Sequence, residues 1–147
     1  MLFRSVSQSR YRLMTMFTRV RDHLFHQKDK NLAKVMERSI YSGHYCFAMN
    51  GYEHGFFSEL EWNVYMKWVD LIIYQQCRAP LGFIYLRAEP EVCHRRVRVR
   101  DRKGEETVSL EYVSQIHNWH EKFLIDKTTI APHLKDIPVL VLDAVLS

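Results

Sequence analysis

The sequence of 147 residues contains only five glycines and four prolines, which argues against a collagen-like, low-complexity or disordered chain. Its three cysteines, Cys46, Cys77 and Cys93, are widely spaced and form no C-x-x-C pair, so they predict neither a zinc site nor a disulfide framework. No apolar run approaches the roughly 18 to 20 residues that cross a bilayer. We therefore expect a reduced, cytoplasmic protein without a membrane partner.

The composition provides what a packed core needs. Hydrophobic residues make up 47% of the chain and aromatic residues 13%. A chain of this length buries roughly 70% of the surface that its unfolded form exposes. The formal net charge of +4 suits anionic ligands such as nucleotides but specifies none of them. We find no internal repeat or linker and expect one domain over residues 1–147.

The first 21 residues contain five arginines and no acidic residue, and this pattern has two interpretations. A mitochondrial presequence has such a composition, so the mitochondrion is an alternative compartment. An amphipathic helix over 9–25 is the other interpretation, because apolar residues recur at steps of three and four. These residues are Leu13, Met16, Phe17 and Val20.

Hydrophobic periodicity predicts an alternation of helices and strands. Helices are expected at 9–25, 40–49, 58–76, 89–100 and 110–126, with a break at Asn50-Gly51. Short apolar runs predict strands at 32–36, 82–86 and 137–142. The last two runs are continuously apolar, which is typical of strands buried on both faces of a parallel sheet. The alternation predicts an α/β fold.

The tripeptide Glu37-Arg38-Ser39 follows the first predicted strand, and ligands of open parallel sheets bind at the carboxyl ends of strands. Alone, the tripeptide fits an ordinary salt-bridged surface turn better than a ligand site. It continues, however, through residues 40–47 into the longer pattern E-R-S-hydrophobic-aromatic-S-x-x-Y-x-F. This longer pattern resembles the signature of a known family, and that resemblance favours a ligand site over a surface turn.

A run of arginines occupies the end of the predicted helix 89–100 and the residues after it. They are Arg95, Arg96, Arg98, Arg100 and Arg102. Like charges four residues apart weaken a helix unless an anion neutralises them, and guanidinium groups match phosphate oxygens well. A triphosphate is the obvious anion, although the run alone is more typical of a solvated basic helix or a nucleic-acid patch. Because no recognition motif or stacking platform accompanies the run, we expect no nucleic-acid partner.

Together these patterns resemble the deoxynucleoside kinase family over nearly the whole chain. The matching segments are residues 37–47, the strand-turn-helix at 83–93, and the arginine run followed by His117-x-x-His120-Glu121. The resemblance implies a P-loop-kinase-like, three-layer parallel sheet with flanking helices. It also implies transfer of the γ-phosphate of ATP to the 5′-hydroxyl of a deoxynucleoside, with Mg²⁺, in a homodimer formed through helices within 40–76. His117 and His120 have no third ligand nearby in sequence, so they predict no metal site.

The family resemblance assigns roles on the donor side of the reaction. Glu37 would help to hold the Mg²⁺ that bridges the donor phosphates. Arg96 and Arg102 match arginines of the family's lid that grip those phosphates, and Arg100 matches one that lies against the donor base. Glu105 matches the lid acid that hydrogen-bonds the sugar hydroxyl. These roles are electrostatic and positional, as phosphoryl transfer requires.

The resemblance also assigns roles on the acceptor side. Arg38 would contact the acceptor and orient the catalytic base, and Phe47 would stack on the nucleobase. Gly43 stands where some family members have an acidic residue, and a small residue here predicts a pyrimidine or broad-specificity pocket. Gln8 is the expected contact for the base edge, with Ser9 as the alternative.

One part of the family pattern is missing from the 147 residues. The family begins with a strand and a G-x-x-x-x-G-K-[ST] loop that cradles phosphates, and this sequence contains no such loop. The family's general base, a glutamate, would also precede Met1. We therefore expect a kinase domain without its first strands and P-loop, with open sheet edges and either low solubility or a partner chain. The alternative is a catalytically inactive nucleotide-binding or dimerising remnant.

Overall fold

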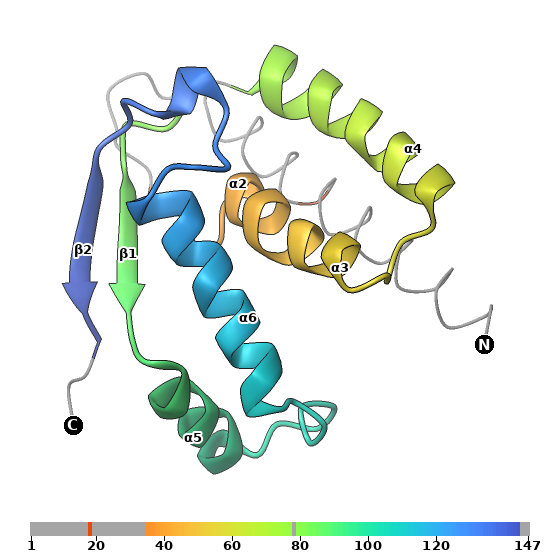
Figure 1. Ribbon diagram of the computed structural model, residues 1–147. Coiled ribbons are helices and arrows are strands. Elements are labelled where there is room, and N and C mark those ends of the chain that lie inside the picture. Colours follow the sequence, from red (N-terminus) through yellow and green to blue (C-terminus); the bar gives the residue numbers. More distant parts are fainter. Residues whose placement is uncertain (1–17, 19–34, 78, 145–147) are drawn as a thin grey trace. The chain divides into compact units, whose positions relative to one another are not determined.

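The computed structural model describes Thr18 and residues 35–77 and 79–144 (Figure 1). The chain divides into two compact units, Met1–Arg78 and Ala79–Ser147. Apart from Thr18, the predicted helix 9–25 and the predicted site residue Gln8 lie outside the described residues. Most of the predicted strand 32–36 does so too. Val35 and Met36, which are described, belong to no strand.

The first unit contains two helical segments. In the first, α2 (Ile40–Ser42), the π-helical η1 (Gly43–Ala48) and α3 (Met49–Glu53) follow one another without interruption. In the second, α4 (Glu59–Val69) continues into the π-helical η2 (Asp70–Gln76). The structure thus confirms the helices predicted over 40–49 and 58–76.

The predicted break at Asn50-Gly51 is wrong. Both residues lie within α3 and both are buried, so tertiary packing overrides the turn preference of this dipeptide. The helix ends instead at His54, and the chain turns at Gly55, whose φ of 70° suits a residue without Cβ. The next helix begins at Ser58, which forms a reciprocal capping box with Glu61.

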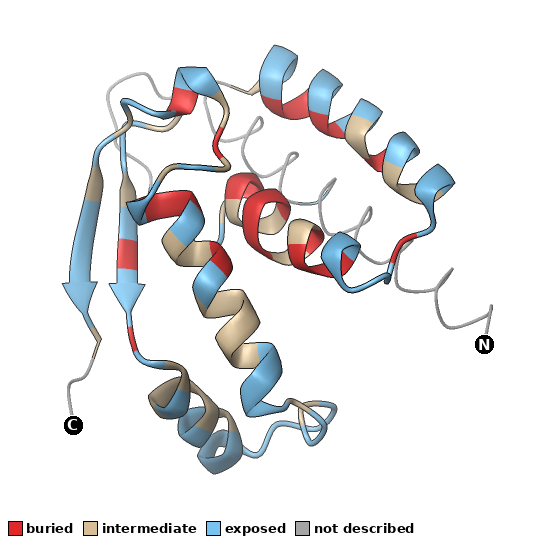
Figure 2. Cartoon of the chain, viewed as in Figure 1, coloured by how far each residue is buried: buried red, intermediate tan, exposed pale blue. Residues whose placement is uncertain are grey.

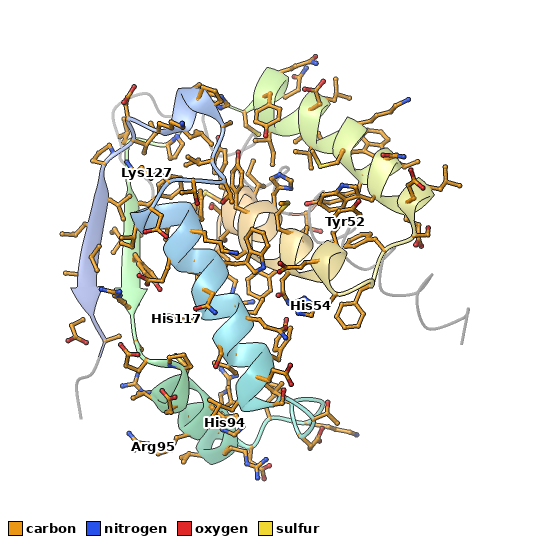
Figure 3. All side chains as sticks on the ribbon, in the orientation of Figure 1. Tyr52, His54, His94, Arg95, His117 and Lys127 are labelled. Carbon is orange, nitrogen blue, oxygen red and sulfur yellow. The ribbon has the colours of Figure 1, made fainter. Side chains whose placement is uncertain are left out.

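Aromatic side chains join the two helical segments of the first unit. Tyr52 of α3 stacks on Trp62 of α4 with ring centroids 4.2 Å apart, and Tyr52 is labelled in Figure 3. Buried residues line both segments, as the red bands in Figure 2 show. Burial of one large apolar side chain stabilises a fold by about 1.5–3 kcal/mol, so this shared core holds the helix that follows Glu37-Arg38-Ser39 in place.

The second unit has an α/β arrangement. Its strands β1 (Phe83–Arg87) and β2 (Val139–Asp143) pair in parallel, with Phe83 opposite Val139 and Arg87 opposite Asp143. Between the strands the chain forms α5 (Pro90–Arg100), α6 (Leu110–His120), the π-helical η3 (Glu121–Ile125) and the short 3-10 helix η4 (Pro132–Leu134). The α/β class and the four corresponding elements are confirmed, whereas the three-layer P-loop-kinase architecture stays a prediction.

The expectation that these strands are buried on both faces is wrong. Successive strand residues point to opposite faces of a sheet. On one face Tyr85 is buried, and the Phe83 ring packs against Phe123 of η3 at 5.3 Å between centroids. On the other face Ile84 and Leu86 are 56% and 65% exposed, because no described element of this unit covers them (Figure 2).

The sheet formed by the described residues has only these two strands. No strand within 35–77 or 79–144 pairs with the second edge of β1, and the open sheet edge stays a prediction. Among the same residues, no helix is both long enough and apolar enough to cross a membrane.

Candidate active site

The Glu37-Arg38-Ser39 turn leads directly into the first helical segment. Ser39 is the N-cap of α2, since its Oγ accepts a hydrogen bond from the backbone N–H of Ser42 at 3.2 Å. This bond satisfies one of the free donors at the helix start. Glu37 and Arg38 precede the cap and are exposed. The turn therefore presents a carboxylate and a guanidinium at the beginning of a helix.

Arg38 has an unusual backbone conformation. Its φ of 53° lies in the left-handed region that residues other than glycine seldom adopt. Its guanidinium carbon lies 5.3 Å from the centroid of the Phe47 ring, in a cation–π contact. Gly43 precedes Phe47 by four residues on the same helical segment, which places both on one side of it. Three residues predicted for the acceptor site are thus close neighbours.

Glu37 is the residue predicted to help bind Mg²⁺. Within the described ranges, no group of three or more His, Cys, Asp or Glu side chains could hold a metal ion. Proteins commonly bind Mg²⁺ through one or two carboxylates while nucleotide phosphates and waters complete the octahedron. A single exposed carboxylate fits this mode of binding, and the assignment of Glu37 stays a prediction.

The helix behind the turn buries three groups that are all uncharged at neutral pH. Burial lowers the pKa of His44 to about 4, and its Nδ1 lies 3.3 Å from the hydroxyl oxygen of Tyr65. Burial raises the pKa of Cys46 to about 12. Burial, with a smaller contribution from Cys77, raises the pKa of Tyr41 to about 12. None of these groups can serve as a charged catalyst at neutral pH.

The other predicted site residues belong to the second unit, at the end of α5. After Arg100 the chain turns through Asp101, which has a left-handed φ of 46°. This turn returns Glu105 to the helix end, where its carboxylate accepts a hydrogen bond from Arg100 at 2.5 Å and lies 3.9 Å from Arg102. We call Arg100, Arg102 and Glu105 the arginine–glutamate cluster.

Arg96, the remaining predicted donor residue, lies outside this cluster. Its guanidinium donates a hydrogen bond to the carbonyl of Ala144, just beyond β2, at 2.7 Å. The backbone N–H of Ala144 donates in turn to the carbonyl of Arg87 at 2.8 Å. Arg96 is therefore held at the carboxyl ends of the two parallel strands, the edge at which α/β proteins bind ligands.

A hollow of about 220 Å³ adjoins the arginine–glutamate cluster. Its lining residues are Val97, Arg98, Asp101, Arg102, Glu105 and Glu106. Glu106 is held by the backbone, because its carboxylate accepts the Gly104 N–H at 2.9 Å, and this bond lowers the pKa of Glu106. The hollow thus offers two guanidinium groups whose charge is balanced by nearby carboxylates.

Sequence reasoning assigned no role to a network at the carboxyl end of β1. The Glu121 carboxylate accepts the Tyr85 hydroxyl at 2.9 Å and the Arg87 guanidinium at 3.1 and 2.7 Å. The ring of His120 stacks on Tyr85, while its Nδ1 lies 2.7 Å from the carbonyl oxygen of Ile116. The network joins η3 to β1. An arginine at the end of a strand and a glutamate in an apolar helix were the two sequence signals of this network.

Comparison with known proteins identifies the family. The family model described as "Deoxynucleoside kinase" matches residues 5–145. The chain is 40% identical over 120 residues to "Deoxyguanosine kinase, mitochondrial" of Xenopus laevis, a match covering 79% of this chain and 45% of that protein. It is 44% identical over 114 residues to "Deoxycytidine kinase 2" of Gallus gallus, covering 75% and 43%.

A third relative is "Thymidine kinase 2, mitochondrial" of Homo sapiens, which is 38% identical over 111 residues, covering 76% of this chain and 41% of that protein. The chain spans less than half the length of these three relatives. The family model nevertheless covers almost every residue from the arginine-rich start to the end of β2. The chain belongs to the deoxynucleoside kinase family.

Proposed function

We propose that this chain acts in transfer of the γ-phosphate of ATP to the 5′-hydroxyl of a deoxynucleoside, with Mg²⁺ as cofactor. The observation that carries the proposal is Arg38, which holds a left-handed backbone while its guanidinium lies over Phe47. A non-glycine residue keeps such a conformation only where the surrounding structure enforces it, and such residues cluster at functional sites. Family membership supplies the reaction for this site to perform.

On the acceptor side, Phe47 would stack on the nucleobase and Arg38 would orient the acceptor and the base that deprotonates it. Phe47 is only half-buried, so part of its ring is accessible to a ligand. Gly43 has no side chain, and a residue this small supports a pyrimidine or broad-specificity pocket. Gln8 retains its proposed contact with the base edge.

On the donor side, Arg96, Arg100 and Arg102 would bind ATP, and Glu105 would bind the sugar hydroxyl of the acceptor. Phosphoryl transfer depends mainly on positioning and on stabilising charge over the phosphate oxygens, which guanidinium groups do well. Glu37 would contribute a carboxylate to Mg²⁺. When bound, this ion would neutralise charge developing on the donor phosphates.

Incubation of the full chain with ATP, Mg²⁺ and labelled thymidine or deoxycytidine tests the proposal. We expect formation of the nucleoside 5′-monophosphate, with a product yield that depends on both ATP and Mg²⁺. Nucleoside binding without any product would instead support the alternative, a catalytically inactive nucleotide-binding remnant of the family. Absence of both binding and product would contradict the proposed function.

We also propose a homodimer as the working assembly. The segment α4–η2 presents an exposed apolar stripe at steps of three and four residues, and we call it the α4 stripe. Its members are Leu60, Val64, Trp68, Leu71 and Tyr74. Monomeric proteins rarely leave a row of large apolar side chains in water, and a second copy offers the same row in return. The stripe lies within 40–76, where the family resemblance places the dimer helices.

Val64→Glu should shift this dimer toward monomer, because it inserts an unpaired charge into the apolar contact. We expect the dimer dissociation constant to rise about tenfold or more, as measured by analytical ultracentrifugation. Asn63→Glu is the matched control, since it adds the same charge to an exposed position of the same helix outside the α4 stripe. A wild-type chain that sediments as a monomer, or equal effects of the two variants, would contradict the proposed interface.

The compartment is proposed to be the cytoplasm, with the mitochondrion as the alternative. Two of the relatives named above are described as mitochondrial. The arginine-rich first 21 residues of this chain suit either compartment, as a presequence or as part of the folded domain.

A further inference from the structure

The arginine–glutamate cluster is closed in this structure. Arg100 and Arg102, the two guanidinium groups nearest the end of α5, both face the carboxylate of Glu105. That carboxylate is three-quarters buried, whereas the arginine side chains are more than half exposed. Glu105 therefore forms a hydrogen-bonded ion pair with Arg100 and a longer ion pair, at 3.9 Å, with Arg102.

A carboxylate and a phosphate present similar oxygens to a guanidinium, so both compete for the same donors. We propose that Glu105 is an internal counter-ion that occupies Arg100 and Arg102 until a triphosphate displaces it. The turn at Asp101 and Gly104, whose φ values are 46° and 93°, brings this carboxylate back to the helix end. Glu105 then acts as an autoinhibitory contact for triphosphate binding.

This role regulates the site described above and, for its second part, rests on the proposed function. If Glu105 also hydrogen-bonds the acceptor sugar, an acceptor that draws Glu105 away frees both arginines for the donor. Linkage then requires the converse, because a donor that captures the arginines frees Glu105 for the acceptor. The exchange makes binding of the two substrates mutually favourable and discourages the site from holding a triphosphate alone.

Calorimetric titration of the full chain with inorganic tripolyphosphate directly tests the role of Glu105 as a counter-ion. Glu105→Gln removes the competing charge, so we expect about two- to fivefold tighter binding, the range set by an exposed ion pair. Arg100→Gln should weaken binding by at least as much. A residue that only shaped the loop, or only bound a sugar, would not improve affinity for tripolyphosphate when neutralised.

Two variants control for general charge effects. Glu106→Gln removes the same charge one residue away, but this carboxylate is bonded to the Gly104 N–H. Lys135→Gln removes an exposed positive charge of the same unit, at a position outside the arginine run. At an ionic strength near 0.15 M, exposed charges more than about 8 Å apart are largely screened, so Lys135→Gln should bind tripolyphosphate almost as the wild type does. Glu106→Gln should gain less affinity than Glu105→Gln, because Glu105 is the carboxylate that pairs with Arg100 and Arg102.

The counter-ion role is overturned if Glu105→Gln binds tripolyphosphate no more tightly than Glu106→Gln, or if no variant binds it. Thymidine and deoxycytidine binding, measured on the same preparations, reports separately on the proposed function. Tighter tripolyphosphate binding by Glu105→Gln without any nucleoside binding would retain the counter-ion and reject the kinase site. Nucleoside binding without tighter tripolyphosphate binding by Glu105→Gln would retain the kinase site and reject the counter-ion.

Discussion

Replacement of Arg38 by alanine is expected to lower kcat/KM for nucleoside phosphorylation about 100-fold or more. Loss of one positioned donor to developing charge costs a reaction about 10²–10³-fold, and Arg38 would serve the acceptor in this way. The chain should remain folded, because the Arg38 side chain is exposed and its cation–π contact with Phe47 contributes only about 0.5–1 kcal/mol. Steady-state kinetics and urea unfolding of the same preparations measure the two effects.

A glycine at the same position separates backbone strain from side-chain function. Left-handed backbone costs a residue with Cβ about 1–2 kcal/mol, part of which is offset by the greater unfolded-state freedom of glycine. Arg38→Gly should therefore be about 1 kcal/mol more stable than Arg38→Ala while being equally inactive. Equal stability of Arg38→Gly and Arg38→Ala would show that the backbone at φ 53° is not strained. Lys135→Ala is the control for loss of an exposed cation and should retain wild-type kinetics.

Local sequence signals predicted most helices because their causes are local. The capping box of Ser58 and Glu61 and the apolar periodicity after it together define the helix over 58–76. The break at Asn50-Gly51 was predicted from an equally local signal and is wrong. There the burial of both residues outweighs a turn preference of less than about 1 kcal/mol.

Contacts between distant residues were not predictable in the same way. Arg87 and Glu121 are 34 positions apart, and only the docking of η3 on β1 brings the guanidinium within 2.7 Å of the carboxylate. An apolar run such as Leu140–Leu142 also does not indicate whether neighbouring layers will cover both faces of the strand. The sequence predicted which residues carry the chemistry, whereas their pairing, as between Glu105 and Arg100, depends on how the chain turns after α5.

The second large expected effect is a loss of folding stability at acidic pH, caused by the buried His44. His44 is 3% exposed, and its ring contacts Tyr65 of α4 and the neighbouring Tyr45. Its pKa falls from 6.5 to about 4 because burial disfavours the charged ring. The unfolded chain therefore takes up a proton below pH 6.5, while the folded chain resists protonation until the pH approaches 4.

Stability should consequently be complete above pH 6.5 and should decline as the pH falls toward 4, by about 3 kcal/mol at roughly 1.4 kcal/mol per pH unit. Urea unfolding at pH 7, 5.5 and 4.5 measures this loss. His44→Gln cannot titrate, so it should be less stable at pH 7 yet should lose much less stability on acidification. His54→Gln, at an exposed position next to α3, is the matched control and should retain the acid loss. If His44→Gln declined as steeply as the wild type, carboxylates elsewhere rather than this ring would control the acid limit of the fold.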